Sequence, residues 1–409
     1  MNLTYKFALI LVCTLIYIYI NTIIRQNIIV EGVQNNKIYF GQSIDMNDSA
    51  AVEYSNGIIL AFDIINKEGG IFGNIIELFI YNDNNITATA IQNAKILINY
   101  DNVLGIIGSM RTPIALSIYD DVIQERTIPY IIPTTGISLP INILNNSLIL
   151  ARPSFQTEID FILMHINQTN IKNICVIYQN DSYGNYCLAE LMNQILVKKY
   201  LINIIKTGYH EKNDINLSYM FKNISGENYL NFNILKKDHL LQKIEAIILF
   251  SSPLQQVKII NYFKSINSNI WIYNISYMGE NTFIYDKLIN TSNIYINSIM
   301  KPIEKYPLLY KKIIADLESF NKYKEENYKF KYTKNFAQGY ICGLFTIELL
   351  KCMNSKKINR EEMIKSLYKK KFFDIYGYQI GPYLYGINNN GRNEVYMYKL
   401  DGNSYKYIY

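Results

Sequence analysis

Residues 57–83, GIILAFDIINKEGGIFGNIIELFIYND, and residues 102–133, NVLGIIGSMRTPIALSIYDDVIQERTIPYIIP, decide the fold. Their apolar runs IIELFIY, VLGIIG and IPYIIP alternate with segments of helical period, and turns rich in Gly, Asn, Asp and Pro separate them. This alternation is typical of βαβ units and predicts a parallel sheet. Ligands bind such sheets outside the carboxyl ends of the strands, so we expect functional residues in loops 82–85, 108–113 and 133–139.

The same region carries short motifs in a fixed order around a helix and three strands. The positions are Asn56, Gly57, Ala61, Ile65, Asn66, Gly69, Gly70, Ile71, Gly73, Asp83, Asn84, Ile107, Gly108, Ile128, Pro129, Ile132 and Pro133. Further segments of the same kind are DSYG at 181–184, a helical stretch at 337–348 and a Gly-containing stretch at 372–393. The ordered set resembles the type I periplasmic binding proteins of the leucine/isoleucine/valine-binding family, the extracellular ligand-binding receptors, over roughly residues 37–400.

The resemblance implies an α/β fold of two lobes, each a mostly parallel sheet flanked by helices, joined by three crossovers. The implied division is a signal anchor or signal peptide at 1–30, lobe 1 at 37–152 and 300–372, and lobe 2 at 153–299, with its terminal strands at 373–409.

Periodicity and turn residues place the individual elements. We expect helices at 52–67, 88–99, from Pro113 onward, and at 307–320, 334–353 and 359–369. We expect strands at 37–42, 173–178, 201–208, 246–252, 270–274 and 294–300, a surface insertion at 214–239 and antiparallel strands within 376–396.

The N-terminus carries an apolar run from Phe7 to Ile24, preceded by Lys6 and followed by Arg25. A helix of this length spans about 27 Å, close to the hydrocarbon core of a bilayer. No A-x-A cleavage signal follows the run, which favours an uncleaved signal anchor over a signal peptide. Either alternative places the rest of the chain outside the cytoplasm, membrane-anchored or secreted.

The composition argues against several classes of function. Hydrophobic residues make up 49% of the chain and the net charge is only +6, with Lys and Arg dispersed, so we expect a folded core and no nucleic-acid surface. The three histidines accompany no nucleophile or metal-binding motif, which predicts no enzyme activity, no cofactor and no metal site. Cys175 and Cys187 are close enough in the predicted fold to pair, although free buried thiols are the favoured alternative.

Two loops supply the candidate site in the first lobe. A helix start at Pro113 presents free N–H groups to an anion. In the resembled family this loop holds a ligand carboxylate, which assigns the role to Thr112 with Ser109 lining the turn. Arg111 departs from the family pattern and either contacts a carboxylate as well or points into solvent. The next loop offers Thr134 or Thr135 to the ligand.

The second lobe contributes three candidates. The resemblance assigns Tyr183 to the residue that closes over the ligand. Phe250 stands at the end of a predicted second-lobe strand and is the candidate for another wall of the site. Ser276 ends the strand after which the family usually has an acidic residue for a ligand ammonium. This departure puts an α-amino acid in doubt and leaves room for amides, urea-like molecules or aromatic acids.

The resemblance implies an extracytoplasmic protein that captures a small polar ligand by hinge closure and passes it to a membrane transporter. The alternative is a ligand-sensing module that acts through a signalling partner. A third reading is a binding fold that acts only through protein contacts.

Overall fold

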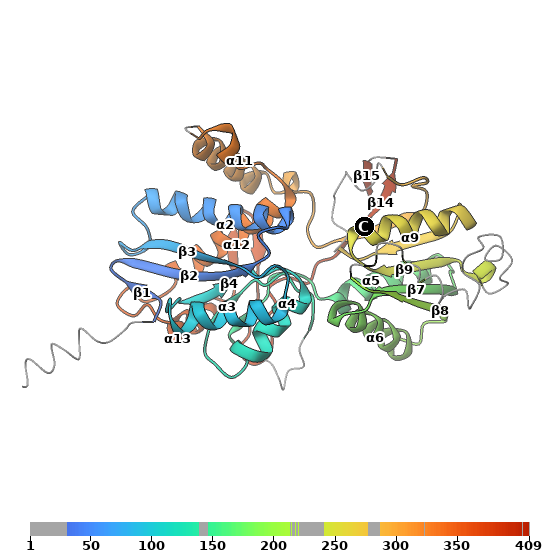
Figure 1. The fold of residues 1–409 in the computed structure, drawn as a ribbon, viewed down its shortest axis with the longest axis horizontal. Coiled ribbons are helices and arrows are strands. Elements are labelled where there is room, and N and C mark those ends of the chain that lie inside the picture. The colour runs from blue at the N-terminus through green and yellow to red at the C-terminus, as the bar shows by residue number, and fades with distance from the viewer. Residues whose placement is uncertain are drawn as a thin grey trace, which may run out of the picture.

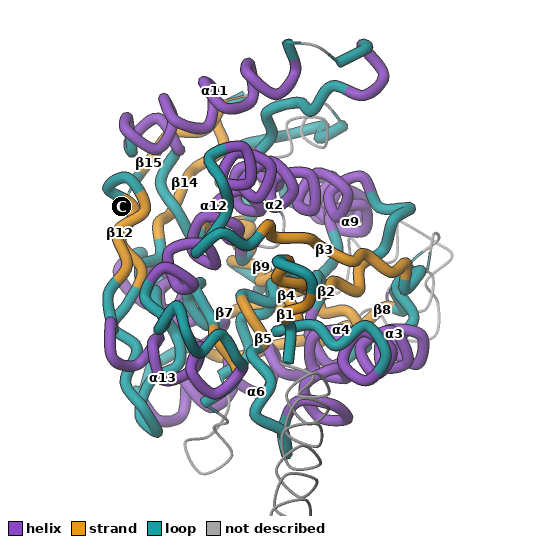
Figure 2. Tube along the Cα trace, turned by 90° about the vertical axis from the view of Figure 1, so that its left-hand side faces the viewer, coloured by secondary structure: helices purple, strands orange, loops and turns teal. Residues whose placement is uncertain are grey.

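The computed structural model describes residues 31–138, 146–212, 214, 217, 220, 241–276, 287–322, 324–402 and 404–408. Two α/β lobes lie side by side along the long axis of the molecule (Figure 1). In the perpendicular view, helices lie above and below the strands (Figure 2). The described part therefore has the layered two-lobe architecture that the sequence predicts.

The first lobe contains a six-stranded sheet in the order β1-β2-β4-β5-β6, with β3 paired to the other side of β2. Only β1 runs antiparallel to its neighbour. The strands are β1 Val33–Gln34, β2 Lys37–Ile44, β3 Ile75–Asn82, β4 Gly105–Ile107, β5 Tyr130–Ile131 and β6 Leu148–Ile149.

Helices cover both faces of this sheet. One apolar cluster involves α2 Ser49–Lys67, α11 Pro307–Asn321, α12 Lys334–Lys351 and α13 Arg360–Lys370. A second cluster on the opposite face involves α3 Thr87–Asn99, α4 Thr112–Ile118 and the π-helical turn η1 Tyr119–Ile123. The two faces are visible in Figure 1, where α2 and α12 lie above the strands and α3 and α4 below them.

The second lobe contains a seven-stranded sheet in the order β15-β14-β11-β10-β9-β7-β8. Its strands are β7 Asn173–Gln179, β8 Asn203–His210, β9 Ala246–Phe250, β10 Trp271–Asn274, β11 Ile294–Ser298, β14 Tyr396–Asp401 and β15 Ser404–Tyr407. The first five are parallel, whereas β14 and β15 are antiparallel additions. Helices α5 Phe155–Gln168 and α6 Ser182–Val197 pack in one apolar cluster, and α9 Pro253–Ile266 packs in another.

The chain crosses between the lobes three times: after β6, after β11 and before β14. One element differs from the predicted division. Strands β12 Phe373–Ile375 and β13 Tyr378–Ile380 form a hairpin whose apolar side chains pack into the α12 cluster of the first lobe. The assignment of residues 373–409 to the second lobe is therefore wrong for this hairpin, because its buried residues meet α12, and only β14 and β15 join the second sheet.

Some predictions fall on residues outside the described ranges. The apolar run from Phe7 to Ile24 lies there, as does most of the insertion at 214–239. Among the described residues no helix combines the length and apolar character needed to cross a bilayer. Cys175 and Cys187 are both buried free thiols, as favoured from the sequence.

Candidate functional site

The turn before α4 is held by an ion pair that the sequence did not predict. Arg111 precedes the first residue of α4 and has a φ of 72°, a backbone conformation that is uncommon for residues other than glycine. Its guanidinium pairs with Asp48, which also caps α2 through its side chain. The charge of Arg111 is therefore paired with Asp48, and a contact of Arg111 with a ligand carboxylate stays a prediction.

The hydroxyls of Thr112 and Thr135 meet each other. Both residues are buried, and the Thr135 Oγ1 donates to the Thr112 Oγ1 at 3.2 Å. Thr134 is half-buried, and its backbone N–H donates to the carbonyl of the buried Ser109 at 2.8 Å. The structure thus brings Ser109, Thr112, Thr134 and Thr135 together, although the hydroxyls of the three threonines are already engaged, that of Thr134 with the Ser109 carbonyl at 3.4 Å.

The loop 133–138, which we call the bridging loop, reaches from the first lobe into the second. The backbone N–H of Phe155 on α5 donates to the carbonyl of Gly136 at 2.6 Å. The hydroxyl of Tyr186 on α6 accepts the N–H of Ser138 at 3.2 Å. Ile137 is 6% exposed and belongs to the apolar cluster of the second lobe. The bridging loop therefore joins the lobes in addition to the three crossings.

Two predicted residues of the second lobe are buried in its core. Tyr183 is 4% exposed and packs edge-on against Phe155, with ring centroids 5.3 Å apart. Phe250 ends β9 and is fully buried in the same cluster. Neither residue lines the cavity described below.

Ser276 belongs to a buried ionic network. Its N–H and hydroxyl donate to the carboxylate of Glu158 at 2.7 and 2.8 Å. The same carboxylate forms an ion pair with Nη2 of Arg152, which also donates to the Ser276 hydroxyl at 3.1 Å. Burial raises the pKa of Glu158, and the charge of Arg152 partly opposes that shift. The carboxylate of Glu158 on α5 therefore lies beside Ser276, where the sequence itself has no acidic residue. This carboxylate is already paired with Arg152.

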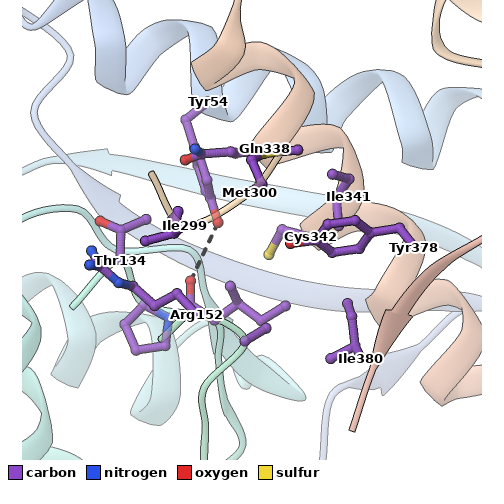
Figure 3. Close-up of a pocket in the computed structure, with 13 residues that line it drawn as sticks. Tyr54, Thr134, Arg152, Ile299, Met300, Gln338, Ile341, Cys342, Tyr378 and Ile380 are labelled. Carbon is purple, nitrogen blue, oxygen red and sulfur yellow. Dashed lines mark hydrogen bonds between the residues drawn. The ribbon is translucent and has the colours of Figure 1, made fainter. Parts of the chain in front are cut away.

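A cavity of about 70 Å³ lies where the crossings meet the first lobe. Figure 3 shows its lining residues, which come from α2, the bridging loop, the first two crossings, α12 and the β12–β13 hairpin. They are Tyr54, Ile132, Pro133, Thr134, Ala151, Arg152, Ile299, Met300, Gln338, Ile341, Cys342, Tyr378 and Ile380. Because two of the crossings form its wall, a change of the angle between the lobes changes its shape.

Thr134 is the one predicted site residue in this lining, and sequence reasoning missed the others. Arg152 carried the best signal, since it is a charged residue directly after an apolar strand at the first predicted crossover. The residues from α12 and the hairpin carried none, because helical and strand periodicity accounts for them as core.

The comparisons with known proteins agree with this architecture. A family model described as periplasmic binding protein matches residues 46–224. An extracellular ligand-binding receptor from Verminephrobacter eiseniae superposes with a TM-score of 0.74 at 15% identity, over 91% of this chain and 100% of that one. This chain has the type I periplasmic binding protein fold. The resemblance and the two-lobe fold class predicted from the sequence are confirmed.

Other structures with this periplasmic-binding-protein fold differ in the ligands that their names state. A branched-chain amino acid transporter substrate-binding protein from Streptococcus pneumoniae, solved with isoleucine, has a TM-score of 0.69 at 17% identity, over 91% of this chain and 99% of that one. A fatty acid transporter substrate-binding protein from Thermomonospora curvata has a TM-score of 0.71 at 15% identity, over 93% of both chains. No curated protein matches the sequence of this chain.

Proposed function

We propose that this protein is an extracytoplasmic solute-binding protein that captures a small polar ligand between its lobes and delivers it to a membrane transporter. The ligand is an amino acid, an amide or a related small carboxylate. We place the protein outside the cytoplasm, either anchored to a membrane by the N-terminal apolar run or secreted after that run is cleaved. The role requires binding and hinge motion only, with no chemical step.

The observation that carries the proposal is the cavity at the hinge. It is lined by two of the three lobe-connecting segments, at Ala151–Arg152 and Ile299–Met300, and by the end of the first-lobe sheet at Ile132–Thr134. A ligand in this position contacts the segments that must rotate when the lobes close. Its binding energy can therefore favour one lobe arrangement over another.

The site residues predicted from the sequence form part of this proposal. We place the hydroxyl of Thr134 in contact with the ligand, supported from behind by Ser109, Thr112 and Thr135. Arg111 acts indirectly by fixing the turn through Asp48. On the second-lobe side, Ser276 supports the network of Arg152 and Glu158, whereas Tyr183 and Phe250 support the wall behind it.

Calorimetric titration against amino acids, amides and small carboxylates tests the proposal. We expect one class to bind and to raise the melting temperature, since a ligand that binds only the folded state stabilises it. Thr134→Val should weaken that binding at least about ten-fold, because it removes one hydroxyl at nearly constant volume. Leu196→Ala, on the exposed surface of α6, is the control and should keep full affinity. If no compound in the panel binds, solute capture is overturned.

The second candidate is a ligand-sensing module that acts through a signalling partner. It is favoured if a ligand binds but no transporter component interacts with the liganded protein. Pull-down of a permease with the liganded protein, and not with the Thr134→Val variant, would support transport instead.

A further inference from the structure

A second pocket lies where the second and third crossings meet the β12–β13 hairpin, and we call it the crossing pocket. Its volume is about 350 Å³, five times that of the hinge cavity, and the two share no lining residue. The wall includes Lys301 of the second crossing, Gln379 of the hairpin and residues 391–394 of the third crossing. An ion the size of phosphate therefore fits in it with water around the ion.

A buried cation, Arg392, is built into the wall of this pocket. Arg392 is 6% exposed, and its guanidinium lies 4.1 Å from the ring centroid of Tyr378. Nη1 donates to the carbonyl of Gln379 at 2.9 Å, and Nη2 donates to Oε2 of Glu394 at 2.7 Å. Nε is buried without a partner. Because a guanidinium carries five N–H donors, Arg392 keeps the capacity to donate to further oxygens.

Lys301 is the second cation of the pocket. Its side chain is exposed, and Nζ lies 5.3 Å from the ring centroid of Tyr396. Within the described ranges the ammonium has no hydrogen bond and no ion pair. Since Glu394 pairs with Arg392, the charge of Lys301 is left without a counter-ion.

Glu394 is the one carboxylate among the described residues that line the pocket. Its Oε2 accepts from Arg392 and from the hydroxyl of Tyr396 at 2.6 Å, and its side chain is 66% exposed. Burial and the hydrogen bond to Glu394 raise the pKa of Tyr396, so this phenol is neutral near pH 7. Two cations and one carboxylate therefore give the lining a net charge of +1.

Two side-chain amides add further donors. Gln379 and Asn393 line the pocket, and within the described part of the chain their amide groups form no hydrogen bond. Together with Lys301 and the spare N–H groups of Arg392, they make a wall in which donors outnumber acceptors. Such a wall favours a ligand with several acceptor oxygens and negative charge.

We propose that the crossing pocket binds a small oxyanion of the phosphate type between Lys301 and Arg392, as an effector distinct from the captured solute. The occupant contacts two of the three segments that connect the lobes, so its binding energy can favour one lobe arrangement. The proposal goes beyond solute capture, and the two sites are tested separately.

Calorimetric titration of the full-length protein with inorganic phosphate, at an ionic strength held constant with sodium chloride, tests the site. We expect phosphate to bind at least about ten-fold more tightly than glycine, which adds an ammonium that Lys301 and Arg392 repel. If phosphate does not bind, the proposal is overturned. If glycine binds as tightly as phosphate, the pocket takes zwitterions and the oxyanion class is overturned.

A matched pair of lysine variants locates the site. Lys301→Gln should weaken phosphate binding about ten- to a hundred-fold, because it removes a charged hydrogen-bond donor. Lys305→Gln makes the same change of charge at an exposed residue outside the lining, and it should keep the affinity within about two-fold. Equal affinities of the two variants would show that phosphate binds elsewhere or through general screening, and would overturn the site.

Glu394→Gln is expected to act in the opposite direction. It removes the carboxylate and leaves the charge of Arg392 unpaired, while the amide oxygen can still accept from Arg392 and Tyr396. Phosphate should therefore bind several-fold more tightly, a gain that loss of folding cannot produce. Weaker binding of phosphate to Glu394→Gln would overturn the assigned electrostatics of the pocket.

The effector role has its own measurement. In small-angle X-ray scattering, saturating phosphate should change the radius of gyration of the wild type and of Lys305→Gln, and should leave that of Lys301→Gln unchanged. Phosphate binding without a change in scattering would overturn the effector role. None of these outcomes decides solute capture, because the hinge cavity has a separate lining.

Discussion

The carboxylate of Glu158 has the environment with the clearest consequence for pH. It is fully buried, and burial raises its pKa above the ordinary value of 4.5 despite the ion pair with Arg152. Below about pH 4.5 it is protonated in both the folded and the unfolded chain. As the pH rises through the folded pKa, the unfolded chain ionises freely whereas the folded chain pays a desolvation cost. Folding stability contributed by this group is therefore present at low pH and lost on raising the pH.

We predict that the difference in unfolding free energy between the wild type and Arg152→Gln/Glu158→Gln changes with pH in this direction. The wild type should lose stability relative to the double variant as the pH is raised from 4 to 8, because the variant has no titrating group here. Urea unfolding at several pH values measures the difference. A difference that stays constant across the range would contradict the assigned pKa shift.

The sequence predicted the hydroxyl residues of the site better than its ionic residues. Thr112 and Thr134 follow apolar strands within a few positions, so their place at the sheet edge could be inferred locally. The Glu158 contact with Ser276 instead joins residues 118 positions apart. This contact depends on how the second lobe packs against the first lobe-connecting segment. No local sequence pattern predicts that packing.

At the scale of helices, the close crossing of α2 and α12 determines where the cavity wall stands. A Cβ at Gly57 would lie 2.1 Å from the carbonyl oxygen of Phe336, and a Cβ at Gly339 would lie 1.8 Å from that of Tyr54. Tyr54, Ile341 and Cys342 line the cavity from these two helices. Because Gly57 and Gly339 have no side chains, α2 and α12 approach closely, and Tyr54, Ile341 and Cys342 from these helices line the cavity.

We predict that Gly57→Ala destabilises the protein, although Ala is the better helix former. The helix propensity gain is about 0.5–1 kcal/mol, whereas forcing the helices apart costs about 1–3 kcal/mol or more. The net change should appear as a lower melting temperature together with weaker ligand binding, because α12 moves with the cavity wall. Gln92→Ala on the exposed side of α3 is the control and should change stability by less than about 0.5 kcal/mol. A stabilised Gly57→Ala variant would show that α2 and α12 accommodate a methyl group at their contact without moving apart.

Helix existence was easier to predict than lobe membership. The segments at 334–353 and 359–369 become α12 and α13 with ends shifted by at most two residues, since their apolar period is local. The β12–β13 hairpin was assigned to the wrong lobe because alternation alone shows that one face is buried, and does not show which core buries it.

For the whole molecule, the bridging loop is a non-covalent contact between the lobes. It adds Ile137 of the first lobe to the core of the second, with hydrogen bonds to Phe155 and Tyr186 on either side. Three covalent crossings alone permit rotation about a hinge, but a buried side chain resists separation until its apolar contacts are lost. The ligand-free protein should therefore favour a compact arrangement.

We predict that Ile137→Ala shifts the ligand-free protein toward open arrangements, seen as a larger radius of gyration in small-angle X-ray scattering. The matched control is Ile171→Ala. Both residues are 6% exposed in the same apolar cluster, but Ile171 belongs to the second lobe itself. Each substitution should lower stability through a cavity, by about 2–5 kcal/mol at most. Only Ile137→Ala should change the scattering, and saturating ligand should reverse that change by favouring the closed state. If the two variants scatter alike, the buried contact of the bridging loop does not hold the lobes together, and their arrangement is determined by the three crossings alone.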